Sequence, residues 1–150
     1  MLLMFAWTLM TAMMVMNASS KDCPLLDDSN PLKRRCLWNN AICGKSVSGK
    51  CTSLCNCRNG QKCSMNSTHT ITVVPYYING VPVKKRYYTC MDVAELGQCS
   101  STQEALYSLI YEETELKNAK VYCECRSPKV YLRLFTPKRY ICRRAEPRTG

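Results

Sequence analysis

Hydrophobic and polar positions alternate most clearly in the middle of the chain, where two runs rich in β-branched and aromatic residues lie close together. These runs span residues 70–78 and 81–89, and Asn79-Gly80 separates them. Asn-Gly favours a tight hairpin turn because both central residues of such a turn take positive φ angles. The pattern therefore predicts a β-hairpin over residues 70–89. Pro75 and Pro82 cannot donate ladder hydrogen bonds, so the hairpin is expected at a sheet edge or as a projecting finger.

The second half of the chain has a weaker helical pattern followed by strand patterns. Ser101-Thr-Gln-Glu104 has the form of a capping box, and apolar residues follow at roughly helical spacing up to Leu116. We therefore expect one helix over residues 101–116, although the β-branched and tyrosine residues there leave a strand as the alternative. Strands are predicted at residues 121–125, 130–135 and 140–142, with a turn at 126–128.

The N-terminus begins with an apolar run, Met1 to Met16, that has no ionisable side chain, and small residues follow at Ala18 and Ser20. This layout is typical of a secretory signal peptide, predicted here as residues 1–20. The run is shorter than the roughly 20 apolar residues of a membrane span, and a short N-terminal anchor is the alternative. Residues 21–150 are then expected to be one secreted, extracellular domain without stable membrane insertion, and residues 143–150 a flexible tail.

The cysteines dominate the composition, because all 12 lie beyond the signal segment and four of them crowd into residues 51–63. An even number in a secreted chain indicates a fully paired framework, and each bridge typically adds about 2–4 kcal/mol of stability. Zinc is the alternative, but the close pairs are Cys-x-Cys rather than Cys-x-x-Cys, so no metal or cofactor is expected. The predicted fold is small and disulfide-rich, with mainly β-hairpins, irregular loops and one short helix. The predicted bridged residues are Cys23, Cys36, Cys43, Cys51, Cys55, Cys57, Cys63, Cys90, Cys99, Cys123, Cys125 and Cys142.

A weak internal repeat relates two parts of the chain. Cys55-Asn-Cys57-Arg58 precedes a hairpin ending in Lys85-Arg86-Tyr87-Tyr88-Thr-Cys90, and Cys123-Glu-Cys125-Arg126 precedes one ending in Lys138-Arg139-Tyr140-Ile-Cys142. Two related hairpin modules are therefore predicted, at about 51–90 and 121–142. Seven cysteines precede the first hairpin and five follow it, so at least one bridge must link the two sides if all are paired. The repeat predicts that Cys90 bonds Cys55 or Cys57, and that the modules are covalently linked.

The charge pattern suits a binding surface, with a merely solubilising surface as the alternative. The formal net charge is +10, and basic clusters fall on both predicted hairpins beside tyrosines. Such a surface suits an acidic protein or the vestibule of a membrane protein, because the field steers association and tyrosine supplies contact area. A heparin-like glycan is the rival partner, and a secreted chain rarely meets nucleic acid. The candidate binding residues are Lys84, Lys85, Arg86, Tyr87, Tyr88, Lys138, Arg139 and Tyr140.

Residues for catalysis are sparse. His69 is the only histidine, so the chain offers no Ser/His/Asp or Cys/His constellation. Glu112, Glu113 and Glu115 are expected on the wet face of the predicted helix rather than as an acid–base pair. We therefore expect a protein that is not an enzyme. Asn66-Ser67-Thr68 is an N-glycosylation acceptor in a predicted loop.

Several cysteine motifs resemble those of a known family. Cys43-Gly44-Lys, Cys55-Asn-Cys57-Arg58-Asn-Gly60-Gln-Lys-Cys63 and Tyr87-Tyr-Thr-Cys90 resemble the scoloptoxin-11 family of centipede venom. This resemblance implies a secreted venom component with toxin activity. Cys55-x-Cys57-x-x-Gly60-x-x-Cys63 also resembles the colipase-like motif of prokineticins, although a long hairpin follows Cys63 here, and insect giant-lens antagonists are a weaker likeness.

The expected function is that of a monomeric, non-enzymatic toxin that binds a membrane protein such as an ion channel. The alternative is an extracellular signalling ligand or antagonist that binds a growth factor or a receptor, and a third possibility is an enzyme inhibitor.

Overall fold

The computed structural model describes residues 33–110 and 115–149. These residues form strands, short 3-10 turns and irregular loops held together by disulfides, which confirms the predicted small disulfide-rich β fold. The predicted signal peptide, Cys23, Glu112 and Glu113 lie outside the described residues.

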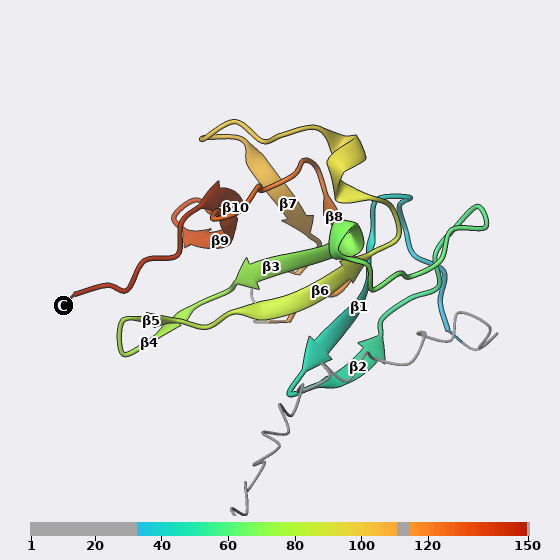
Figure 1. Ribbon diagram of the computed structural model, residues 1–150, viewed down its shortest axis with the longest axis horizontal. Helices are drawn as coiled ribbons and strands as arrows, with labels where there is room; N and C mark the ends of the chain where they lie inside the picture. The colour runs from blue at the N-terminus through green and yellow to red at the C-terminus, as the bar shows by residue number, and fades with distance from the viewer. Residues whose placement is uncertain (1–32, 111–114, 150) are drawn as a thin grey trace, which may run out of the picture.

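Residues 33–90, called here the first module, contribute four strands to the main sheet. β1 (Ile42–Val47) and β2 (Lys50–Ser53) form one hairpin, while β3 (Thr70–Val74) and β6 (Lys85–Thr89) form the base of another. β1 also pairs with β6, so the strand order is β2-β1-β6-β3. Between β3 and β6, the short strands β4 (Tyr77–Ile78) and β5 (Val81–Pro82) form a separate ribbon that extends away from the main sheet (Figure 1).

Residues 97–143, called the second module, contain four strands with the same pairing, placed in the opposite order along the sheet. β7 (Glu104–Ser108) and β8 (Ala119–Val121) correspond to β1 and β2, while β9 (Val130–Phe135) and β10 (Lys138–Arg143) correspond to β3 and β6. The full order of the eight-stranded sheet is β2-β1-β6-β3-β9-β10-β7-β8. The modules therefore meet at the parallel pair of β3 and β9, where Val73 faces Tyr131 and Val74 faces Leu132.

The equivalence of the modules extends to single hydrogen bonds. The Cys36 N–H donates to the Asn56 carbonyl at 2.8 Å, and the Cys99 N–H donates to the Glu124 carbonyl at 3.0 Å. In both cases the acceptor is the middle residue of a Cys-x-Cys sequence. The repeated spacing in the sequence thus corresponds to a repeated backbone arrangement, but each module begins upstream of the predicted bounds, at the cysteine that bonds the first member of Cys-x-Cys.

The disulfides follow the same repeat. In each Cys-x-Cys sequence the first cysteine bonds upstream, as Cys36–Cys55 and Cys99–Cys123, and the second bonds the cysteine that ends the hairpin, as Cys57–Cys90 and Cys125–Cys142. The Cys57–Cys90 bond confirms the predicted link from Cys90 back to the cysteine cluster. The first module has a further bridge, Cys43–Cys63, and Cys51 is also disulfide-bonded.

The predicted covalent link between modules is wrong for the described residues. The first hairpin divides the cysteines seven to five because Cys90 is counted with those that follow it, but Cys90 closes the first module, so Cys57–Cys90 lies within that module. No bridge between described cysteines joins residues 33–90 to residues 97–143. Beyond the connecting chain, the modules are held together by strand pairing, packing and ion pairs.

Both faces of the first module are covered. One face packs against a core shared by the two modules, which includes Ile71, Val73 and Tyr87 together with Leu106 and Tyr140. The other face packs against a smaller core made largely of cystines, which includes Tyr88. The sheet curls far enough for Ala41, just before β1, to pair with Lys120 of β8. This curvature brings β1 of the first module beside β8 of the second.

The helix predicted over residues 101–116 is wrong, because residues 104–108 form β7. β7 pairs with β10 on one side and β8 on the other, and Ala105 and Leu106 are both fully buried. Adjacent buried residues suit a strand covered on both faces, and this tertiary pairing outweighs the local helical pattern. The strand prediction at 130–135 is confirmed by β9, and the return strand at 140–142 lies within β10.

The hairpin predicted at residues 70–89 is confirmed, with Asn79 and Gly80 at φ angles of 48° and 77°. The expectation of an edge position fails for its base, since β3 and β6 both have neighbours on each side. Pro75 directly follows the end of β3, and Pro82 lies in β5 of the projecting ribbon. Neither proline takes part in the pairing of β3 with β6. Only the residues after the buried Pro75, from 76 to 84 and called the finger below, project as predicted.

Candidate functional site

The finger is a narrow ribbon with an apolar tip. Tyr77 pairs with Pro82 and Ile78 pairs with Val81, and the Val83 N–H donates to the Tyr76 carbonyl at 3.0 Å. Ile78 and Val81 face each other across the turn and are 55% and 60% exposed. Large apolar side chains presented side by side at a turn are available for contact with another molecule.

The base of the finger is held more firmly than the tip. The two strands that continue from it, β3 and β6, lie inside the eight-stranded sheet, and Cys90 at the end of β6 is bonded to Cys57. At the finger itself, the Lys85 ammonium lies 5.6 Å from the centre of the Tyr76 ring. The tip is thus supported by a covalently braced sheet, an arrangement that limits the entropy lost when a partner binds.

The segment after β10 contacts the finger on one side. The Arg148 N–H donates to the Gly80 carbonyl at 2.8 Å, and the Arg148 guanidinium lies 4.3 Å from the centre of the Tyr77 ring. Figure 1 shows residues 144–149 running from β10 toward the β4–β5 ribbon. The segment expected as a flexible tail therefore has defined contacts, and it adds a cation beside the apolar tip.

The tyrosines predicted as contact residues are core residues instead. Tyr87, Tyr88 and Tyr140 are only 1%, 4% and 1% exposed. Tyr87 and Tyr88 are consecutive in a strand, so their rings point to opposite faces, and each face carries its own core. The Tyr87 hydroxyl accepts a hydrogen bond from the Leu116 N–H at 3.3 Å. Burial, opposed by this hydrogen bond, raises the pKa of Tyr87 to about 12.

The predicted basic residues divide into different roles. Lys85 and Lys45 both bind the Glu115 carboxylate, at 2.7 and 2.5 Å, so Lys85 links the first module to the second. Burial raises the pKa of Glu115, but the hydrogen bonds from Lys45 and Lys85 outweigh it and hold the pKa below its ordinary value. Lys84, Arg86 and Lys138 are exposed, whereas Arg139 is half-buried.

The charged side chains of the sequence around the finger all have the same sign. No aspartate or glutamate occurs from Ser29 to Met91, so the first module contains only basic charges. The acidic residues of the described chain lie in the second module and the short segments around it. The finger therefore emerges from the cationic half of the molecule, which favours the approach of an acidic partner.

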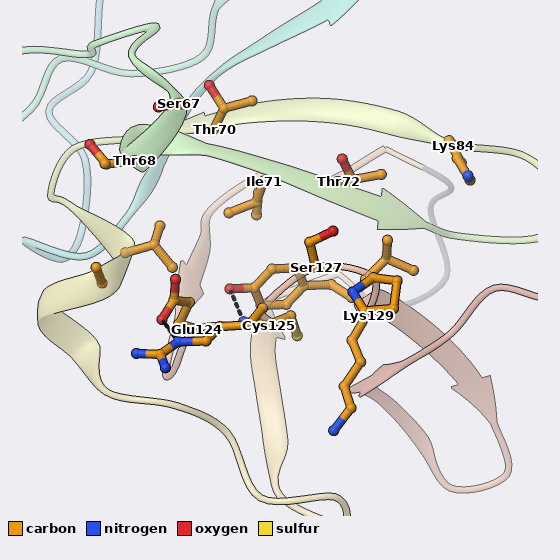
Figure 2. Close-up of a pocket in the computed structure, with 16 residues that line it drawn as sticks. Ser67, Thr68, Thr70, Ile71, Thr72, Lys84, Glu124, Cys125, Ser127 and Lys129 are labelled. Carbon is orange, nitrogen blue, oxygen red and sulfur yellow. Dashed lines mark hydrogen bonds and ion pairs between the residues drawn. The ribbon is translucent and has the colours of Figure 1, made fainter.

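A groove of about 620 Å³ lies where β3 and β9 diverge. One wall is formed by β3 with Lys84 and the 3-10 turn of residues 67–69, and the other wall by residues 124–130. Figure 2 shows Ile71 projecting from β3 toward the wall that carries Cys125 and Ser127. Sequence reasoning missed this groove, because its walls come from distant segments and no single motif marks it.

The histidine, the clustered cysteines and the glycosylation acceptor complete the set of predicted groups. His69 is half-buried and its Nδ1 lies 2.9 Å from the Thr89 carbonyl oxygen, so it helps to join β3 to β6. In three groups of cysteines the sulfur atoms lie close enough together to hold a metal ion, but every cysteine in these groups is disulfide-bonded. Asn66 is exposed before the 3-10 turn, as a glycan acceptor must be. Within the described ranges, no helix has the length and apolar character needed to cross a membrane.

Comparison of the chain with protein-family models, curated proteins and solved structures finds no match.

Proposed function

We propose that the protein is a secreted, non-enzymatic toxin whose finger binds the extracellular part of a membrane protein such as an ion channel. The observation that carries the proposal is the pair Ile78 and Val81, which lie exposed at the tip of a ribbon rooted in a disulfide-braced sheet. The resemblance of the cysteine motifs to centipede venom proteins supports the same reading.

Charge supports the choice of partner. Lys84 and Arg148 lie at the base and side of the finger, and the first module has no acidic residue to oppose them. Channel vestibules and receptor loops rich in carboxylates would attract this surface, and the apolar tip would then supply buried contact area. The two roles fall on different residues, so they can be tested separately.

The test uses the full mature chain, folded with its disulfides, labelled with a fluorophore and bound to intact excitable cells. The double variant Ile78→Ser/Val81→Ser should bind at least about tenfold more weakly, the loss expected for removing about 1.4 kcal/mol of contact energy. Val47→Ser is the matched control, because Val47 is a 49% exposed apolar residue at the turn of another hairpin.

Treating the cells with a protease before binding identifies the class of partner. If the partner is a membrane protein, protease treatment should abolish binding of the unmodified chain. Equal binding by the finger variant and by the Val47→Ser control would contradict the proposal. Alanine at Lys84, Lys85 and Arg86 together is a poorer test, since Lys85 also binds Glu115 and its loss would disturb the contact between modules.

A further inference from the structure

The groove between β3 and β9 has a lining suited to a ligand that is both polar and anionic. Its walls carry hydroxyl side chains at Ser67, Thr68, Thr72 and Ser127. Serine and threonine hydroxyls both donate and accept hydrogen bonds. They are therefore suited to the hydroxyl groups of a sugar, which also donate and accept. Thr70 is less available, because its hydroxyl already donates to the Asn66 carbonyl at 2.8 Å.

The floor of the groove is apolar. Ile71, Val93 and Tyr131 line it, and all three are almost completely buried. The Tyr131 hydroxyl donates to the Cys123 carbonyl at 2.8 Å and accepts from the Cys125 N–H at 3.2 Å, which fixes its ring in place. A fixed apolar floor below polar walls is the usual construction of a small-molecule site, and a groove of about 620 Å³ lies in the size range of such sites.

The charges around the groove come from both modules. Lys84 belongs to the first module, whereas Arg126 and Lys129 belong to the second. The only acidic residue in the lining is Glu124, and its carboxylate is already bound by Arg126 at 2.9 Å. Arg86, directly opposite Thr72 in the β3–β6 pair, adds an exposed cation on the neighbouring strand. The groove therefore carries a net positive charge on two sides.

We propose that this groove binds a sulfated saccharide, such as a segment of the anionic glycan chains found at cell surfaces. Sugar rings lie on the apolar floor, their hydroxyls bond the serine and threonine side chains, and sulfate groups pair with Lys84 and Lys129. This site is distinct from the apolar tip of the finger, although Lys84 at the base of the finger belongs to both surfaces, and glycan binding there would hold the protein at a cell surface.

The probe for the test is a heparin-derived tetrasaccharide, with its fully desulfated form as the chemical control. Binding is measured by calorimetry on the folded chain produced without glycosylation, so that no sugar on Asn66 enters the groove. The double variant Lys84→Gln/Lys129→Gln should weaken binding at least about fivefold, and desulfation should weaken it by a similar or larger factor. The matched control is Lys50→Gln/Lys62→Gln, which removes the same charge from exposed residues outside the groove lining.

The outcomes distinguish specific binding in the groove from the general attraction of an anionic sugar to a basic protein. Retention of affinity in the Lys50→Gln/Lys62→Gln control, with loss in the groove variant, supports the proposal. Equal losses in both variants, equal binding of the desulfated sugar, or equally strong competition by polyglutamate would overturn it. The finger variant Ile78→Ser/Val81→Ser should keep full tetrasaccharide affinity, so failure of the finger proposal leaves this result unchanged.

Discussion

Replacing Cys57 and Cys90 together by alanine tests how much the covalent brace at the base of the finger contributes to stability. The bridge closes a loop with a sequence separation of 33 residues, and none of the other described bridges shortens that path. In the chain-entropy model, a loop of this size corresponds to about 3.7 kcal/mol at 25 °C. Alanine rather than serine is used because Cys90 is buried and a hydroxyl there would need a partner.

The equivalent bridge of the second module provides the comparison. Cys125–Cys142 has a separation of 17 residues, for which the same model gives about 3.1 kcal/mol. The double alanine variants should therefore lose similar amounts of stability, slightly more for the first module. Guanidinium unfolding, followed by circular dichroism with the other disulfides intact, measures both. A loss below about 1 kcal/mol for the Cys57/Cys90 variant would refute the view that the bridge constrains the unfolded chain and supports the finger.

Three further predictions concern the contacts between parts of the molecule. Glu115→Gln should cost about 0.5–1 kcal/mol at pH 7, because two lysines lose their partner. Since the hydrogen bonds from Lys45 and Lys85 hold the folded pKa of Glu115 below the ordinary 4.5, this stabilisation is present above pH 4.5 and is lost as the pH falls through the folded pKa, so the difference in unfolding midpoint should shrink in acid. Gly80→Ala should displace residues 144–149, because a Cβ at this positive φ angle would collide with the Arg148 carbonyl oxygen, and hydrogen exchange should then show no protection of the Arg148 amide. Gly49 has a similar φ angle and open space around it, so Gly49→Ala should cost about 1 kcal/mol of stability and leave the Arg148 amide protected. Burial raises the pKa values of Tyr87, Tyr131 and Tyr140, so ultraviolet titration should show a group of phenols that ionise late, and Tyr87→Phe should remove one of them. Their contribution to stability is complete below pH 10 and is lost as the pH rises through the folded pKa values, which for Tyr87 is about 12.

Local chemistry explains which parts of the fold could be read from the sequence. Asn79-Gly80 has few alternatives to a tight hairpin turn, so the turn was predictable. The repeated Cys-x-Cys-Arg spacing likewise narrowed the partner of Cys90 to Cys55 or Cys57, because a repeated backbone repeats its bridges, and the structure selects Cys57. The boundary between modules was not predictable, since cysteine parity counts bridges without showing which residues enclose which strands.

The errors arose where tertiary pairing decides the environment of a residue. Ala105 and Leu106 fit one face of a helix as well as the two covered faces of a strand, and only pairing with β8 and β10 selects the strand. Tyr87 and Tyr88 read as exposed neighbours of basic residues, but a sheet with a core on both sides buries both. The exposed tip was overlooked because Ile78 and Val81 look like ordinary strand residues until the ribbon is seen to leave the sheet.

Peptide mapping of the folded chain under non-reducing conditions determines whether the two modules are cross-linked separately. We expect linked peptides for Cys57–Cys90 and Cys36–Cys55 in the first module, and for Cys99–Cys123 and Cys125–Cys142 in the second. A peptide joining Cys90 to any of the four cysteines from Cys99 onward would contradict this expectation.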